Sequence, residues 1–216
     1  MTIAFRAALG GVLVGLLTAA VPAAAVNLIV NGDFEDASFG GTTGYYNVGD
    51  PGSGADHPIP PGFGWSVPFN NVDIIANGVY AANLPTGGAY NLDLVGYGST
   101  GAIAQTFATE AGKVYRISLD YTQNGSGKTA DVVVGTSILT TLEASSVWQS
   151  WTTTFVGTGD PTTLVIAEIL GGSNAGVILD NISVTAVPEP ATWAMLITGF
   201  GMVGYGLRRR RASVTV

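Results

Sequence analysis

Between residues 26 and 187, hydrophobic and polar positions alternate with a period of two, which is typical of β-strands with one buried face. From Tyr115 to Tyr121, every second residue is apolar and the residues between them are polar. The pattern predicts strands at Ala89–Val95, Ala102–Phe107, Val114–Tyr121, Ala130–Val134, Trp148–Val156, Thr162–Leu170 and Val177–Thr185. About eight to ten short strands separated by glycine- and proline-rich turns indicate one all-β domain, a β-sandwich or jelly roll.

The segment Asp36–Phe63 departs from this alternation, because it holds seven glycines and four prolines and shows no apolar period. A loop of this length in a compact domain is usually a binding loop or a mobile insertion, and both interpretations stay open here. The segment carries Tyr45 and Tyr46, and Tyr80 and Tyr97 lie in or beside other loops. Exposed aromatic rings can stack on sugar rings, so these four tyrosines are candidate ligand contacts.

The N-terminal residues have the organisation of a secretory signal peptide. Arg6 precedes an apolar run that ends in the small residues Ala23, Ala24 and Ala25. A basic start, an apolar stretch and a small-residue exit predict a signal peptide helix over residues 1–25, cut after Ala25 by signal peptidase once the secretion machinery has engaged it. An uncleaved membrane anchor is the alternative.

The C-terminal residues predict a second membrane segment. Residues 191–207 are uncharged and are followed by Arg208, Arg209, Arg210 and Arg211. Seventeen helical residues span roughly 26 Å, slightly less than the hydrocarbon core of a bilayer. We therefore expect a short transmembrane helix at 191–207, with the arginines and the tail 212–216 in the cytoplasm and residues 26–186 outside.

The order of parts from Val187 to Arg211 resembles the PEP-CTERM sorting signal in its PEPxxWA form. Pro188, Glu189 and Pro190 come first, then the glycine-rich apolar helix, then the arginine cluster. The resemblance implies an envelope protein of a Gram-negative bacterium, held transiently in the inner membrane. A membrane-embedded, exosortase-like protease would process it near Pro188–Pro190 and leave the ectodomain at the cell surface or outside the cell. A plain tail anchor is the alternative.

Six further sequence pieces occur in order along the body of the chain. They are NLIVNGDFE (27–35), GW (64–65), NNVDII (70–75), YNLDLVG (90–96), IAQTFAT (103–109) and ILDNISV (178–184). Together they resemble the choice-of-anchor C family, which is related to exported and plant cell-wall proteins. The resemblance implies a galactose-binding-like jelly roll over residues 26–186 and a role in polysaccharide binding.

Asp180 is the most informative single position. Strict alternation places it on the same inward side as Ile178 and Ile182, where an unpaired carboxylate would be too costly to bury. Asp33 and Glu35 could approach it if the first and last strands are neighbours. Carboxylates suit calcium, and by resemblance Glu35 and Asp180 match the positions that hold structural Ca²⁺ in galactose-binding-like modules. A network of hydrogen bonds to backbone amides is the alternative.

Charge and composition exclude several kinds of function. Residues 26–187 hold three basic and fourteen acidic side chains, a net charge of −11, so their surface repels nucleic acid. The chain has no cysteine, which excludes thiol nucleophiles and thiolate metal sites. Its one histidine, His57, lies in the proline-rich segment, and no GxSxG nucleophile motif is present.

Glu168 shares the alternating side of Leu164 and Ile166, so it is either a second inward acid or the mark of a bulge.

These features favour an exported, non-catalytic module that binds extracellular polysaccharide or matrix. A structural surface protein that associates with itself is the first alternative. A glycoside hydrolase or lyase with two unrecognised carboxylates is the second, because sequence does not show how far apart carboxylates lie in the fold.

Overall fold

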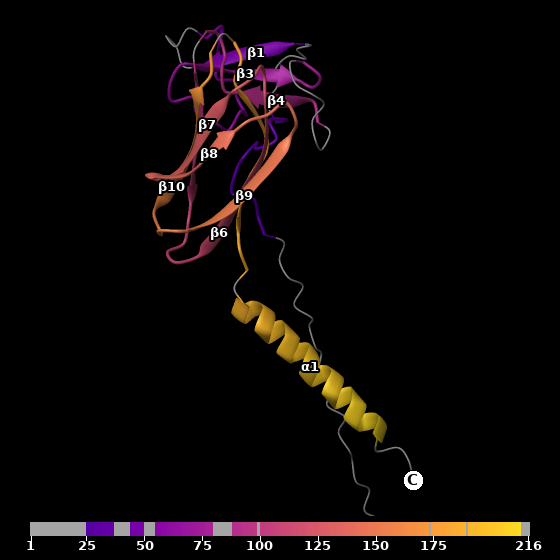
Figure 1. Ribbon diagram of the computed structural model, residues 1–216. Coiled ribbons are helices and arrows are strands. Elements are labelled where there is room, and N and C mark those ends of the chain that lie inside the picture. Colours follow the sequence, from indigo (N-terminus) through magenta and orange to yellow (C-terminus); the bar gives the residue numbers. More distant parts are fainter. Residues whose placement is uncertain are drawn as a thin grey trace, which may run out of the picture.

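The computed structural model describes residues 25–36, 44–49, 55–79, 88–98, 100–172, 174–188 and 190–212. These residues form a sandwich of two β-sheets, from which a single helix projects (Figure 1). The helix, α1 (Pro190–Ala212), begins four residues after the end of the last strand at Ala186. The predicted all-β sandwich of the jelly-roll type is confirmed.

The larger sheet has seven strands among the described residues, in the order β2-β1-β3-β4-β11-β6-β9. All neighbours in it are antiparallel except β1 and β2, which run parallel. The strands are β1 (Tyr45–Gly49), β2 (His57–Pro58), β3 (Asn71–Ala76), β4 (Tyr90–Asp93), β6 (Val114–Gln123), β9 (Gln149–Val156) and β11 (Val177–Ala186).

The smaller sheet has four antiparallel strands among the described residues, in the order β5-β10-β7-β8. They are β5 (Ala102–Ala108), β7 (Thr129–Val134), β8 (Ser137–Glu143) and β10 (Pro161–Leu170). The core lies between the sheets, and alternate residues of the central strands fill it, as in Ile117 and Leu119 of β6 and Leu164 and Ile166 of β10. The outward residues of β6 are polar, as in Arg116, Ser118 and Asp120, whereas β10 also has apolar outward residues, Val165 and Ala167.

All seven predicted strands are present, with bounds that differ by one to two residues at most ends. Four strands were not predicted. β3 and β8 lie outside the predicted segments, and β1 and β2 lie within the predicted loop Asp36–Phe63. The prediction of a segment without regular structure is therefore wrong for Tyr45–Gly49 and His57–Pro58. β1 forms because it pairs with β3, which is remote in sequence, so local composition does not reveal it.

The structure describes the C-terminal helix but not the N-terminal residues of the chain. Residues 1–24 lie outside the described residues, so the signal peptide stays a prediction. The C-terminal helix is confirmed as a helix, and it extends past the predicted segment 191–207 at both ends. Within the described part of the chain, however, no helix combines the length and the hydropathy needed to cross a membrane.

Candidate functional site

The N-terminal turn of the NGDFE sequence lies against the last strand. The amide of Ile182 donates to the carbonyl of Gly32 at 2.9 Å, and the amide of Leu28 donates to the carbonyl of Val184 at 2.8 Å. A Cβ atom on Gly32 would clash with the carbonyl oxygen of Ile182, so this close approach requires glycine. The first and last segments of the domain are therefore neighbours, as expected.

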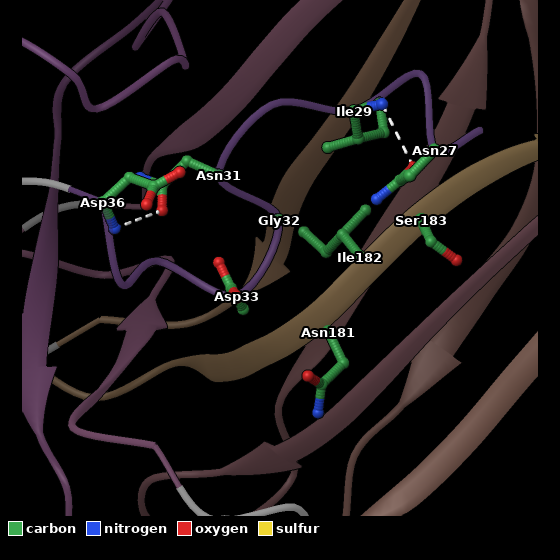
Figure 2. Close-up of a pocket in the computed structure, with 9 residues that line it drawn as sticks. All are labelled: Asn27, Ile29, Asn31, Gly32, Asp33, Asp36, Asn181, Ile182 and Ser183. Carbon is green, nitrogen blue, oxygen red and sulfur yellow. Dashed lines mark hydrogen bonds between the residues drawn. The ribbon is translucent and has the colours of Figure 1, made fainter.

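A pocket of about 330 Å³ opens between this turn and β11 (Figure 2). The polar side chains around it hold the turn together. Oδ1 of Asn27 accepts the amides of Ile29 at 3.1 Å and Val184 at 2.9 Å. Oδ1 of Asn31 accepts the amide of Asp36 at 2.9 Å, as the dashed line in Figure 2 shows. These hydrogen bonds fix the chain around the pocket.

Asp180 does not lie on the core side, so that prediction is wrong. A β-bulge between Asp180 and Ser183 shifts the register of β11 against β6, and Asn181 at the bulge has a φ of 52°. Leu179 and Ile182 belong to the core, whereas Ile178 and Asp180 face away from it. The extra residue of the bulge reverses the alternation, which strict period-two counting misses.

Asp180 is nevertheless buried, with 2% of its surface exposed. One of its oxygens accepts the amide of Asn181 at 2.7 Å. Burial, with smaller contributions from the negative charges of Asp120, Glu35 and Asp33, raises the pKa of Asp180 to about 7, although the hydrogen bond from Asn181 opposes the rise. The three residues of the predicted calcium site thus lie in one neighbourhood, with an excess of negative charge.

Glu35 is engaged in hydrogen bonds there. Its Oε1 accepts the amides of Ala89 at 2.7 Å and Tyr90 at 3.0 Å, so it ties the N-terminal turn to the start of β4. In the described parts of the chain, no three acidic or histidine side chains gather closely enough to hold a metal ion. A structural calcium ion at Glu35 and Asp180 would need backbone carbonyls for most of its ligands, and it stays a prediction.

A second group of buried acids lies at one end of the sandwich. Glu168 is 4% exposed, and the register of β10 shifts directly after it. Glu168 is therefore both an inward acid and the mark of a bulge, the two interpretations that its sequence position allowed. Its Oε2 accepts the amide of Val177 at 2.9 Å, while Oε1 is buried without a hydrogen-bond partner. Burial, with a smaller contribution from the charge of Asp93, raises the pKa of Glu168 to about 8. Burial also raises the pKa of Asp93 to about 7.

Near this end, two exposed tyrosines come together in a small pocket. Tyr45, at the start of β1, and Tyr97, in the loop after β4, line a cavity of about 80 Å³ together with Asp73 and Asn174. Tyr45 is 50% exposed and Tyr97 is 69% exposed. Large aromatic rings that stand this far into solvent beside a polar cavity are typical of binding sites.

Hydrogen bonds from neighbouring loops fix the wall of this tyrosine pocket. The amide of Tyr97 donates to Oδ1 of Asn71 at 2.6 Å, and the amide of Gly98 donates to Oδ1 of Asn174 at 2.7 Å. Nδ2 of Asn124 donates to the carbonyl of Asn174 at 3.2 Å. Four segments that are distant in sequence are thereby held in one geometry, which lowers the cost of ordering them around a ligand.

Asp73 supplies the charged group of the tyrosine pocket. It is 7% exposed, and its Oδ1 accepts Nδ2 of Asn47 at 2.6 Å. Burial raises the pKa of Asp73 to about 6, the hydrogen bond from Asn47 opposes that rise, and the charge of Asp56 adds to it. Most Asp73 carboxyls are therefore ionised at neutral pH. Sequence analysis did not find Asp73, although its place between Val72 and Ile74 puts a polar residue on the face opposite the core.

Of the other two candidate tyrosines, Tyr46 does not line this pocket. Tyr46 packs against the core and stacks on His57 of β2, with ring centroids 4.2 Å apart and an interplanar angle of 4°. His57 thus takes part in an aromatic pair with Tyr46. Tyr80 lies outside the described residues.

The residues of the expected sorting signal surround the start and end of α1. Pro188 is exposed, and Pro190 is the first helical residue, a position that suits proline because it needs no amide donor. Glu189 lies outside the described residues. Arg208 is exposed, and Arg209, Arg210 and Arg211 belong to the end of the helix. Ala25, the expected cleavage position, is exposed.

Several of the solved structures that the chain resembles are carbohydrate-binding modules. The "Family 16 Carbohydrate Binding Module-2" has 20% sequence identity and a TM-score of 0.47, and the alignment covers 73% of this chain and 99% of that one. TmCBM61 in complex with β-1,4-galactotriose has 16% identity and a TM-score of 0.48, with 75% and 99% covered. A family 35 module from Clostridium thermocellum has 14% identity and a TM-score of 0.39, with 52% and 86% covered.

Sequence comparison gives two family matches. No curated protein matches the chain. The model of the PEP-CTERM protein-sorting motif matches residues 186–211, which marks an exported protein. The model described as "Protein of unknown function (DUF642)" matches residues 27–185, and this range contains both sheets of the sandwich. The chain therefore belongs to the DUF642 family.

Proposed function

We propose that this protein is an exported, non-catalytic module that binds a glycan at the tyrosine pocket formed by Tyr45, Asp73, Tyr97 and Asn174. The observation that carries the proposal is the convergence of two exposed tyrosine rings on a cavity with a buried carboxylate. The rings come from the start of β1 and from the loop after β4, and hydrogen bonds fix that loop.

The chemistry of the pocket suits a sugar. The apolar face of a sugar ring can pack on a tyrosine ring, and this contact tolerates the polar edge of the sugar. Hydroxyl groups of the sugar would donate to the carboxylate of Asp73, and they would exchange hydrogen bonds with the amide of Asn174. A hydrogen bond to a charged acceptor is the stronger of the two kinds, so Asp73 would orient the ring.

The sorting motif supplies the cellular setting of this proposal. Cleavage after Ala25 and processing near Pro188–Pro190 by an exosortase-like protease would deliver the sandwich to the cell surface or outside the cell. There it would hold extracellular polysaccharide, and its partners during export would be the secretion machinery, signal peptidase and the protease.

Binding of the full-length chain in mild detergent to a set of immobilised polysaccharides tests the proposal. We expect binding to at least one polysaccharide, and we expect Tyr97→Ala to weaken it about 10-fold, since loss of one stacked ring costs about 1–2 kcal/mol. Tyr205→Ala is the matched control, because Tyr205 of α1 is also 69% exposed. Absence of binding to every polysaccharide, or equal weakening by both variants, would refute the proposal.

A second candidate function is self-association, and strand β9 favours it. β9 lies at the end of the larger sheet, and among the described residues it pairs only with β6. Its sequence, QSWTTTFV, has neither a charge nor a proline, which are the usual protections of a sheet edge. Sedimentation velocity tests this candidate: concentration-dependent assembly that Thr154→Lys abolishes, and Thr136→Lys in the β7–β8 turn does not, would support it.

A further inference from the structure

We propose that the ligand of the tyrosine pocket presents a cation, namely the protonated amino group of an amino sugar, and that Asp73, Tyr45 and Tyr97 receive it. This inference rests on the proposed glycan-binding function and narrows its ligand to a glycan with free amino groups. Neutral and acidic polysaccharides are the ligand classes that it disfavours.

The charge around Asp73 is the first support. Asp73 is nearly buried, and no lysine or arginine in the described part of the chain forms an ion pair with it. Its hydrogen-bond partner is the neutral amide of Asn47, at 2.6 Å. The nearby acids Asp56 and Asp93 add negative charge to the same neighbourhood. A buried carboxylate with no positive partner leaves a favourable place for a cation.

The tyrosine rings are the second support. The face of an aromatic ring is negative, so a cation over it is attracted, and two rings beside one carboxylate form a site selective for ammonium groups. Tyr45 and Tyr97 line the same cavity as Asp73. The cavity of about 80 Å³ is smaller than a glycan chain needs, and it suits a small substituent such as an amino group. The remainder of the sugar would lie over the exposed rings.

The protonation of Asp73 gives a directional expectation. The groups that face it are Asn47 of β1, Asp93 of β4 and Asp56 of the segment before β2. The pKa of Asp73 is about 6, so its negative charge is present at neutral pH and disappears as the pH falls below about 6. Affinity for a glycan with amino groups should therefore fall in acid, although the amino groups themselves become more fully protonated there.

Two oligosaccharides with the same linkage compare a charged amino substituent with a neutral acetamido one, and the salt dependence and Asp73→Asn isolate the effect of charge. The probes are a β-1,4-linked glucosamine hexamer and its fully N-acetylated counterpart, titrated calorimetrically into the full-length chain in mild detergent at about pH 7. We expect the glucosamine hexamer to bind about 10-fold more tightly or better, and we expect the difference to shrink as salt rises. Asp73→Asn should bring the two affinities within about 2-fold of each other.

Asp160→Asn is the matched control. It removes the same charge from an exposed residue that directly precedes β10, whereas Asn174 of the tyrosine pocket follows the other end of that ten-residue strand, which spans about 30 Å. This variant should keep the preference for the glucosamine hexamer. Tyr97→Ala gives a second measurement that does not alter a buried group, and it should reduce the preference as well.

The outcomes distinguish this inference from the proposed function. Equal binding of both hexamers, or tighter binding of the acetylated one, would overturn the cation inference and leave glycan binding intact. Binding of neither hexamer by a chain that does bind another, neutral polysaccharide would also overturn it. Absence of binding to every glycan would overturn both. A preference that Asp160→Asn reduces as much as Asp73→Asn would show general charge attraction and overturn the role of the pocket.

Discussion

The buried carboxyl group of Glu168 should make the protein less stable as the pH rises. Its pKa is about 8 in the folded protein against 4.5 for an unperturbed glutamate. The folded state therefore holds the proton more tightly than the unfolded state. Stability is full below about pH 4.5 and declines as the pH rises through about 8, because the unfolded chain ionises first.

The size of this effect follows from the pKa difference. Each pKa unit corresponds to about 1.4 kcal/mol, so the shift from 4.5 to about 8 amounts to on the order of 5 kcal/mol. That figure is an upper limit for Glu168 alone, since Asp93 lies nearby and the two groups repel each other when both are ionised. Asp73, Asp93 and Asp180 have folded pKa values of about 6 to 7, so the loss between pH 7 and 9 belongs mainly to Glu168.

Urea unfolding of the full-length chain at pH 5, 7 and 9, followed by the fluorescence of the buried Trp65, measures the effect. The wild type should lose several kcal/mol between pH 5 and 9. Glu168→Gln should match it at pH 5 and be the more stable protein at pH 9, because glutamine cannot ionise. Glu143→Gln, on the exposed side of β8, should follow the wild type. Wild-type stability that stays level or rises from pH 5 to 9 would refute the reasoning.

Three further predictions concern the terminal turn, the calcium ion and the ends of the chain. Gly32→Ala should lower the stability by about 2–4 kcal/mol through its clash with Ile182, whereas Gly44→Ala, with open space around it, should change the melting temperature little. If calcium ties Glu35 to Asp180, a chelator should lower the melting temperature of the wild type but not of Asp180→Ala; equal curves with and without chelator would exclude the ion. Mass spectrometry of the protein isolated from its host should show ends after Ala25 and near Pro188–Pro190, and an intact C-terminal helix in the mature protein would contradict exosortase-type processing.

The strands of the core could be predicted because their packing leaves a local signal. In β6, Tyr115, Ile117 and Leu119 all face the other sheet, so the period-two alternation of apolar residues in the sequence matches the side chains that are buried. In β11 the same rule failed at Asp180, because one extra residue at the bulge reverses the faces and leaves no mark in the hydrophobic pattern. Alternation locates a strand well, but it assigns a face only where the strand is regular.

The tyrosine pocket was predictable only in part. Loop position alone singled out Tyr45 and Tyr97, together with Tyr46 and Tyr80, as candidate ligand contacts. Their convergence could not be predicted, because it depends on the pairing of β1 with β3 and on the bond from Gly98 to Asn174 across the fold. Asp73 could not be identified as a site residue for the same reason, because its neighbours on the outer face come from strands that are remote in sequence.

The most direct test of a glycan-binding role is a titration of the full-length chain with the polysaccharide that it retains most strongly, followed by the NMR signals of its tyrosine rings. The proposal predicts that the signals of Tyr45 and Tyr97 shift together along one binding curve, while the ring of Tyr205 stays unchanged. A binding curve in which neither Tyr45 nor Tyr97 shifts would place the ligand elsewhere and contradict the proposed site.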